Sequence, residues 1–268
     1  MICFPNCKIN IGLNVVEKRK DGFHNIETVF YPVGLCDAFE IVESKKLSIK
    51  FSGIKIKGNT NDNLCIKAYN LIAENYNIPP VNIFLHKAIP AGAGLGGGSS
   101  DAAHMLFLIN KMFSLNISKE KLFHFASLLG SDCSFFMNNI PAFAHGRGDI
   151  TENISLNLKG YHILIVKPNF EISTAKAYSL IKPALSKYSL KEISLKNIKE
   201  WGNLAVNDFE VPVSKEFPEI IKIKDRLYKS GAVYASMTGS GSAVYGIFEA
   251  EPEIPSVFEK HFTWKGLI

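Results

Sequence analysis

Hydrophobic and polar residues alternate near the start of the chain. The apolar positions are Cys7, Ile9, Ile11, Leu13 and Val15. A period of two is typical of a β-strand, so Lys8, Asn10 and Asn14 share its opposite face. An Asp-Gly pair at 21–22 predicts a turn, after which residues 26–33 resume an extended pattern.

Further elements follow from the same periodicities. The strands on either side of the Asp-Gly turn predict a β-meander for the first third of the chain, and further strands are predicted over 39–44, 47–51 and 81–87. Helices are predicted over 63–75, over the apolar stripe Ala102, Met105, Leu106, Ile109 and Phe113, and over 119–129, ended by Gly130. The middle helix follows a glycine-rich segment, residues 90–100, and Ser99, Ser100 or Asp101 can cap it.

The second half also mixes helices and strands. It reads as a strand over 161–167, helices near 174–182, 194–206 and 216–230, a hairpin around 238–242, and a last helix near 252–262. The composition changes near 145–160, so we predict an N-terminal domain over 1–155 and a C-terminal domain over 156–268. The elements lack the regular alternation of a doubly wound sheet, which indicates an α+β fold.

The composition excludes several classes of protein but does not show which molecule the protein binds. The 268 residues are 47% hydrophobic and 21% charged, which excludes disordered and collagenous proteins. The formal charge of +5 comes from scattered basic residues, so it does not predict nucleic-acid binding. The five cysteines form no CxxC pair, His104 and His124 match no metal motif, and no export signal or membrane span is evident. We therefore expect a reduced, cytoplasmic protein with neither a membrane nor a nucleic-acid partner.

The glycine-rich segment 90–100 favours anion binding. Glycines let the backbone approach a ligand, and a helix N-terminus offers free N–H groups and the positive end of its dipole, so phosphate is the natural ligand. A flexible connector is the simpler alternative. Gly92, Gly94 and Gly97 also match the dinucleotide fingerprint of NAD enzymes, although the acidic residue expected about 20 positions on at a strand end is missing.

Lys8, Asn10 and Asp132 admit both a functional and a structural interpretation. A strand lysine often faces solvent, and an aspartate after a glycine can be a plain turn residue. The segment after Asp132 is apolar, however, so a carboxylate at its edge needs a partner, for which Lys8 is a candidate. The loop 238–242 is either a hairpin turn or a second backbone surface that closes on a ligand.

Three segments together resemble the motifs of the GHMP small-molecule kinases. They are the Lys8–Asn10 strand, the loop 90–100 and the loop 238–241, and their order and spacing agree with the family. Residues 21–25 (DGFHN) and 130–136 (GSDCSFF) are similar to the branch that acts on a diphosphocytidyl alcohol in non-mevalonate isoprenoid synthesis. The resemblance covers nearly the whole chain.

The resemblance implies a GHMP kinase fold, with an N-terminal domain like the second domain of ribosomal protein S5 and a ferredoxin-like C-terminal domain. It implies ATP and Mg²⁺ as cofactors, a diphosphocytidyl small molecule as substrate, and Lys8 with Asp132 as the catalytic pair. The residues that match the ATP loop are Pro90, Ala91, Gly92, Ala93, Gly94, Leu95, Gly96, Gly97, Gly98, Ser99 and Ser100. The residues that match the substrate site are Asn10, Phe23, His24, Thr174, Tyr178, Thr238 and Gly239. In that site Phe23 and Tyr178 would stack on the two faces of the cytosine and His24 would contact its edge.

Several points stay open at the level of sequence. Phe23 stands where the branch has tyrosine, which keeps the stacking plane and removes the hydroxyl. Ser99 or Ser100 is a candidate metal ligand by analogy, and a monomer and a homodimer fit equally. A homoserine or mevalonate kinase, an NAD-dependent enzyme and an RNA-binding module are the rival functions.

Overall fold

The chain packs as two compact units. The computed structural model describes residues 1–56, 58–186 and 188–268. Unit 1 comprises Met1–Cys7, Leu35–Ala91 and Gly96–Ile140, and unit 2 comprises Lys8–Gly34, Gly92–Leu95 and Pro141–Ile268. Because these segments interleave along the chain, the predicted division into domains at residue 155 stays a prediction.

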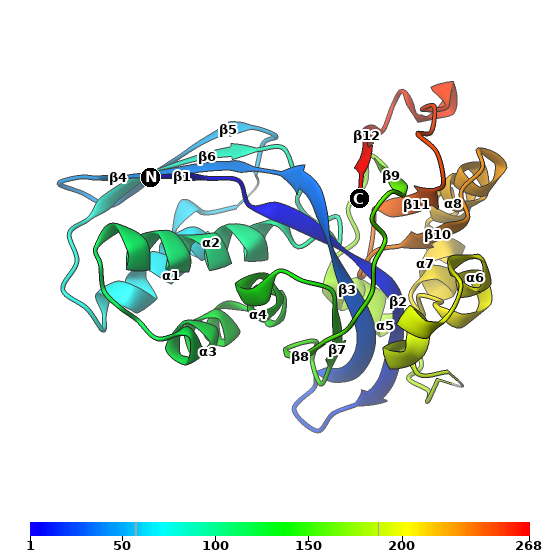
Figure 1. Cartoon of the computed structure of the whole chain (residues 1–268), viewed down its shortest axis with the longest axis horizontal. Helices are drawn as coiled ribbons and strands as arrows, with labels where there is room; N and C mark the ends of the chain where they lie inside the picture. Colours follow the sequence, from blue (N-terminus) through cyan, green and yellow to red (C-terminus); the bar gives the residue numbers. More distant parts are fainter. Residues whose placement is uncertain (57, 187) are drawn as a thin grey trace. The chain divides into compact units, whose positions relative to one another are not determined.

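Unit 1 is a four-stranded sheet with helices on one face (Figure 1). The strands, in the order β1-β4-β6-β5, are β1 (Ile2–Cys3), β4 (Ala38–Glu43), β6 (Val81–Lys87) and β5 (Ser48–Gly53). The helices are η1 (Thr60–Asp62), α1 (Leu64–Ala73), α2 (Gly97–Met112), α3 (Lys119–Leu129) and α4 (Ser131–Asn138). Alternate residues of β6 are buried, so its period of two supplies the apolar face on which the helices pack.

Unit 2 holds most of a sheet in the order β2-β3-β7-β8 and all of a second sheet in the order β10-β11-β9-β12. The strands are β2 (Asn6–Lys18), β3 (His24–Cys36), β7 (Ala142–His145), β8 (Ile150–Asn153), β9 (His162–Lys167), β10 (Tyr234–Met237), β11 (Val244–Phe248) and β12 (Phe262–Leu267). The helices are α5 (Thr174–Ser179), η2 (Leu190–Leu195), η3 (Ile198–Glu200), α6 (Trp201–Leu204), α7 (Glu210–Glu216), α8 (Glu219–Lys229) and η4 (Ser256–Phe258). Helix α8 lies against β10 and β11, as Figure 1 shows, and buries Ile220, Ile223 and Leu227 there.

Most of the predicted elements are confirmed. Strand β6 and helix α3 have the predicted bounds, and β2 contains all five alternating apolar positions, each of them buried. The helix predicted over 252–262 is wrong, because only a single 3₁₀ turn, η4, precedes β12, which pairs antiparallel with β9. The β-meander is wrong as well, because β4 and β5 belong to a different sheet from β2 and β3.

The state of the cysteines and the character of the helices concern the cellular environment of the protein. Within the described residues, no disulfide joins any of the five cysteines, which are Cys3, Cys7, Cys36, Cys65 and Cys133. None of the helices formed by residues 1–56, 58–186 and 188–268 combines the length and the apolar character that a membrane-spanning helix requires.

Candidate active site

The glycine-rich loop has a backbone that only glycine adopts readily. Gly92, Gly94 and Gly96 have φ angles of 61°, 75° and 70°, whereas the residues between them do not have positive φ. Positive φ carries no steric penalty at glycine. A backbone whose φ alternates in sign in this way is typical of the concave nests that bind anions through N–H groups.

Helix α2 begins at the end of this loop without a side-chain cap. Its N-cap residue is Gly96, and no side chain accepts a hydrogen bond from the first turn. The prediction that Ser99, Ser100 or Asp101 caps the helix is therefore wrong, because the helix starts before them. The N–H groups of the first turn remain available to a negatively charged ligand.

The loop uses its carbonyl groups, not its N–H groups, for packing within unit 2. The carbonyls of residues 93–95 accept hydrogen bonds from Ala243, Lys8 and Thr238 at 3.0–3.1 Å. Among residues 1–56, 58–186 and 188–268, no acceptor is found for the N–H groups of residues 92–95. The loop is therefore held by one set of its polar groups and presents the other set to a ligand.

Lys8 is buried beside this loop. Its side-chain nitrogen donates to Asn10 Oδ1 at 2.7 Å and to the Gly94 carbonyl at 3.0 Å, and lies 4.9 Å from the centre of the Phe30 ring. Lys8, Asn10 and Asn14 are all buried, so the solvent-facing alternative for this side of β2 is wrong. A lysine is rarely buried without partners, and here two oxygens and an aromatic face provide them.

The loop 238–242 packs directly on the glycine-rich loop. The Thr238 hydroxyl accepts from the Asn10 N–H at 3.1 Å and lies 3.0 Å from the Gly94 carbonyl. A Cβ at Gly94 would lie 2.0 Å from the Thr238 carbonyl oxygen, and one at Gly239 would lie 3.2 Å from Gly94 Cα. These two predicted residues therefore lie in the hairpin turn between β10 and β11, and this turn also packs against the glycine-rich loop. That the turn closes on a ligand stays a prediction.

The side chain of Asn10 is occupied within unit 2. Its Oδ1 accepts from Lys8, and its Nδ2 donates to Thr28 Oγ1 at 2.9 Å. Asn10 thus holds Lys8 in place, and its predicted contact with substrate stays a prediction. Thr174, also predicted in the substrate site, is exposed, and its hydroxyl lies 3.3 Å from that of Ser240 beside the 238–242 loop.

Three aromatic rings of the predicted substrate site lie in unit 2. His24 stacks on Tyr178 with ring centres 4.6 Å apart, and Tyr178 meets Phe209 edge-on. Phe23 is 55% exposed, and the guanidinium carbon of Arg147 lies 5.3 Å from the centre of its ring. A base between Phe23 and Tyr178 therefore has to use the Tyr178 face that His24 leaves open or displace His24. Arg147 lies on the β7–β8 turn, and sequence reasoning did not assign it to the substrate site because its short Arg-Gly-Asp motif is an accidental match.

Asp132 lies in unit 1, in the first turn of α4. Sequence reasoning missed this short helix and placed the aspartate in a turn after Gly130. Burial raises the pKa of the Cys133 thiol to about 12, a hydrogen bond with Ser99 opposes this, and the charge of Asp132 adds to it. Helix α2, whose first turn contains Ser99, packs against α4, whose first turn contains Asp132. The structure thus assembles two groups of predicted residues, one around Lys8 in unit 2 and one around Asp132 in unit 1, and the pairing of Lys8 with Asp132 stays a prediction.

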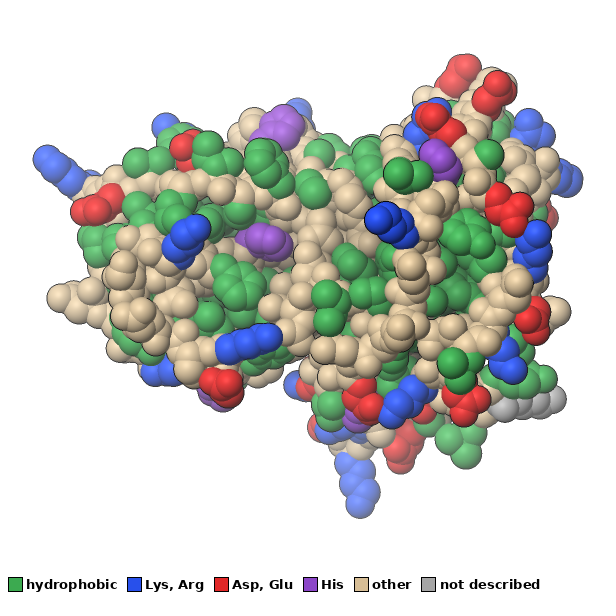
Figure 2. Space-filling model, in the orientation of Figure 1, with side chains coloured by type: hydrophobic (Ala, Val, Ile, Leu, Met, Phe, Trp, Pro, Cys, Tyr) green, Lys and Arg blue, Asp and Glu red, His purple; other side chains and the backbone are tan. Residues whose placement is uncertain are grey.

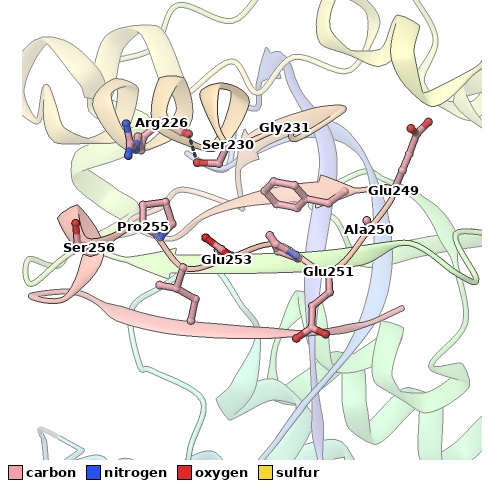
Figure 3. A pocket seen from close by; sticks show the side chains of 12 residues that line it. Arg226, Ser230, Gly231, Glu249, Ala250, Glu251, Glu253, Pro255 and Ser256 are labelled. Atoms are coloured by element: carbon pink, nitrogen blue, oxygen red, sulfur yellow. Dashed lines mark hydrogen bonds between the residues drawn. The ribbon is translucent and has the colours of Figure 1, made fainter.

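A cavity of about 600 Å³ in unit 2 is separate from the predicted residues (Figure 3). It lies between the C-terminal end of α8 and the segment that follows β11, and none of its twelve lining residues is a predicted site residue. Two of its carboxylates are already paired, Glu249 with Lys199 at 2.9 Å and Glu251 with Lys265 at 2.6 Å. On the face drawn in Figure 2, basic and acidic side chains are interspersed, which gives no sign of a polyanion-binding patch there.

Comparison with known proteins identifies the family. A model of the GHMP kinases N terminal domain matches residues 63–147, and one of the GHMP kinases C terminal region matches residues 187–262. The 4-diphosphocytidyl-2-C-methyl-D-erythritol kinase of Bacteroides thetaiotaomicron is 52% identical over 259 residues, which cover 95% of this chain and 94% of the relative. The chain belongs to the GHMP kinase family. A second relative with the same description, from Parabacteroides distasonis, is 50% identical and covers 99% of both chains.

Solved structures agree with this assignment. A crystal structure of 4-(cytidine 5'-diphospho)-2C-methyl-D-erythritol kinase matches 92% of this kinase and 90% of its own chain, with 29% identity and a TM-score of 0.80. The mevalonate kinase of Methanococcus jannaschii has a TM-score of 0.71 at 17% identity, which shows the shared fold alone. The expected α+β GHMP kinase fold is thereby confirmed. The chain is an ATP-dependent small-molecule kinase, so an NAD-dependent enzyme and an RNA-binding module are no longer candidates.

Proposed function

We propose that this kinase transfers the terminal phosphoryl group of ATP to the C2 hydroxyl of 4-diphosphocytidyl-2-C-methyl-D-erythritol, giving the 2-phosphate and ADP in non-mevalonate isoprenoid precursor synthesis. The observation that carries the proposal is the identity of about one half, over nearly the whole chain, with relatives described as kinases of this substrate. A homoserine or mevalonate kinase is the second candidate, but the solved structures of those two kinds in the comparison share at most 17% identity with this chain.

The glycine-rich loop binds the phosphates of ATP in this proposal. The free N–H groups of residues 92–95 and the uncapped start of α2 supply donors and positive potential to the phosphate oxygens. Lys8 adds a cation beside the Gly94 carbonyl. Phosphoryl transfer requires mainly in-line positioning and charge stabilisation, so these groups would neutralise the charge that develops in the transition state.

Asp132 orients the acceptor hydroxyl and takes its proton. A positioned base typically contributes about 10²–10⁴-fold to the rate. The neighbourhood of Asp132 includes Ser99, whose partly exposed hydroxyl is a better candidate for contact with Mg²⁺ than that of the fully buried Ser100. No group of three or more His, Cys, Asp or Glu side chains suited to a metal is found in the described parts of the chain. Mg²⁺ prefers oxygen ligands and in such sites takes several of them from the substrate phosphates and water, so the Ser99 hydroxyl would supply one ligand and the bound ion would offset phosphate charge.

The aromatic group in unit 2 recognises the cytidine. Stacking on an aromatic ring is worth roughly 1–3 kcal/mol per base and tolerates any base, so discrimination needs a polar contact at the base edge. In this proposal His24 makes that contact, and Thr174 and the turn that begins at Thr238 line the acceptor side. We also propose that the protein works in the cytoplasm, which is supported by five cysteines that form no disulfide in the described parts of the chain.

The direct test is a phosphate-transfer assay with purified protein, ATP and Mg²⁺. The acceptors compared are 4-diphosphocytidyl-2-C-methyl-D-erythritol, homoserine, mevalonate and the uridine analogue of the first. We expect ADP release and a phosphorylated product with the cytidine substrate, and far slower turnover with the others. Turnover of homoserine or mevalonate with no reaction of the cytidine substrate would refute the proposal.

A further inference from the structure

A buried cluster of one lysine and two aspartate side chains lies in unit 1, where the glycine-rich loop begins and ends. Lys87 donates to Asp101 Oδ2 at 2.7 Å and also to Asp37 Oδ2. All three side chains are almost fully buried. None of them belongs to the predicted ATP or substrate residues, and they come from distant positions in the chain.

The cluster connects the two ends of the loop. Asp37 Oδ1 accepts the N–H groups of Ala88 and Ile89, at 2.7 and 2.8 Å, where the chain leaves β6 and enters the loop. Asp101 lies on α2, just beyond the point where the chain leaves the loop. Lys87 bonds to both aspartates, so the entry and the exit of the loop are joined through one ammonium group.

The packing around Lys87 depends on a glycine at the start of α2. A Cβ at Gly97 would lie 2.8 Å from Ile89 Cγ2 and 3.4 Å from Lys87 Nζ. The glycine therefore lets the first turn of α2 approach the end of β6 closely enough for the cluster to form. This close approach brings the helix N-terminus and the loop entry into one fixed arrangement.

Stability alone is a weak explanation for this cluster. Buried ion pairs are often no more stabilising than well-packed apolar residues, because desolvation offsets their attraction. Asp101 Oδ1 is buried and finds no hydrogen-bond partner within the described ranges, which adds an unfavourable contribution. Burial lowers the pKa of Lys87, but the neighbouring Asp101 and Asp37 outweigh it, so its pKa is raised and the ammonium stays charged. What the cluster does provide is directional bonding that fixes the spacing of the loop ends.

We propose that Asp37, Lys87 and Asp101 act as a clasp that sets the distance between the two ends of the glycine-rich loop and thereby positions its N–H groups for ATP. They are positioning residues, because they act through the loop and touch no reacting atom. The inference rests on the proposed role of the loop in ATP binding. Within the described residues, the hydrogen bonds of the clasp reach the two ends of the loop and none of Phe23, His24 and Tyr178, so its loss should affect ATP and not the cytidine substrate.

The test compares two variants of Asp101. Asp101→Ala removes the hydrogen bond between Lys87 and α2, whereas Asp101→Asn keeps an oxygen that can accept from Lys87. ADP affinity is measured by calorimetry, and KM is measured for both substrates. The loss of one hydrogen bond to a charged phosphate oxygen is enough to weaken binding about ten-fold, so we expect Asp101→Ala to raise the Kd of ADP and the KM of ATP by about ten-fold or more. The KM of the cytidine substrate should change by less than about two-fold, as for independent sites. Asp101→Asn should restore most of the ATP affinity.

Asn110→Ala provides a matched control for lost stability. Asn110 lies at the other end of α2, where its Oδ1 accepts the Ile117 N–H at 2.9 Å. This variant should lower the melting temperature and leave the KM of ATP at the parent value. The proposal is overturned if Asp101→Ala binds ADP like the parent, if both KM values rise equally, or if Asn110→Ala weakens ATP binding to the same degree. If Asp101→Ala does not fold, Asp101→Ser makes the same comparison under the same criteria. The ADP measurement needs no acceptor, so it distinguishes failure of the clasp from failure of the proposed substrate.

Discussion

Replacement of Gly94 by alanine tests how closely the glycine-rich loop and the 238–242 loop must approach. The added Cβ would lie 2.0 Å from the Thr238 carbonyl oxygen and 2.8 Å from its carbon. Real Cβ contacts are not that short, so one of the two backbones has to move by an ångström or more. Overpacking typically costs about 1–3 kcal/mol. The φ of 75° adds about 1–2 kcal/mol for an L-residue.

We therefore expect Gly94→Ala to lose about 2–5 kcal/mol of the free energy of unfolding, as measured by urea titration. The KM of ATP should rise by about ten-fold or more, because the displaced residue lies in the middle of the proposed phosphate site and its carbonyl binds Lys8. Steady-state kinetics with varied ATP, at saturating second substrate, measure this effect.

Gly160→Ala is a control that has the backbone strain of a positive φ without the steric clash expected at Gly94. Gly160 has a φ of 96°, but a Cβ there would meet nothing within 4 Å. This variant should lose only the about 1–2 kcal/mol that comes from φ and keep the kinetics of the parent. If Gly94→Ala is no less stable than Gly160→Ala and binds ATP with the KM of the parent, the close packing of the two loops has no functional consequence and our reasoning is refuted.

Two further predictions concern Asp132, the proposed catalytic carboxylate, and His24, the proposed contact with the cytosine edge. Asp132→Asn should lower kcat by about 10²–10⁴-fold while the Kd of ATP stays at the parent value, and full activity of this variant would remove Asp132 from the mechanism. Burial, with a smaller contribution from the charge of Lys18, lowers the pKa of His24, so the imidazole is neutral at pH 7. The KM of the cytidine substrate should then be constant above about pH 6.5 and rise as the pH falls through the lowered pKa. His24→Gln should abolish that rise, and a KM that increases toward high pH would contradict a neutral His24 at the base edge.

Many helices and strands of this kinase could be predicted from its sequence, because each depends on a pattern of apolar residues within one short segment. The alternation from Cys7 to Val15 predicts β2, and the bounds of β6 and α3 agree with prediction, since periodicity shows which positions are apolar. The glycine-rich loop and the helix after it could also be predicted, because glycines before an apolar helical stripe lie within one short segment. The family motifs added residue roles, among which the burial of Lys8 beside Gly94 agrees with a functional interpretation of that strand face.

Other features depend on partners that are distant in the chain. Residues 252–262 form only the 3₁₀ turn η4 in place of the predicted helix, and from Phe262 onward the chain pairs with β9 as strand β12. The cluster of Asp37, Lys87 and Asp101 forms only when three separate elements meet, and no short motif contains it. Periodicity tells which face of a strand or helix is apolar, but not which surface will cover it. The tertiary structure therefore decided which polar side chains are buried and paired, because that pairing depends on contacts between residues far apart in sequence.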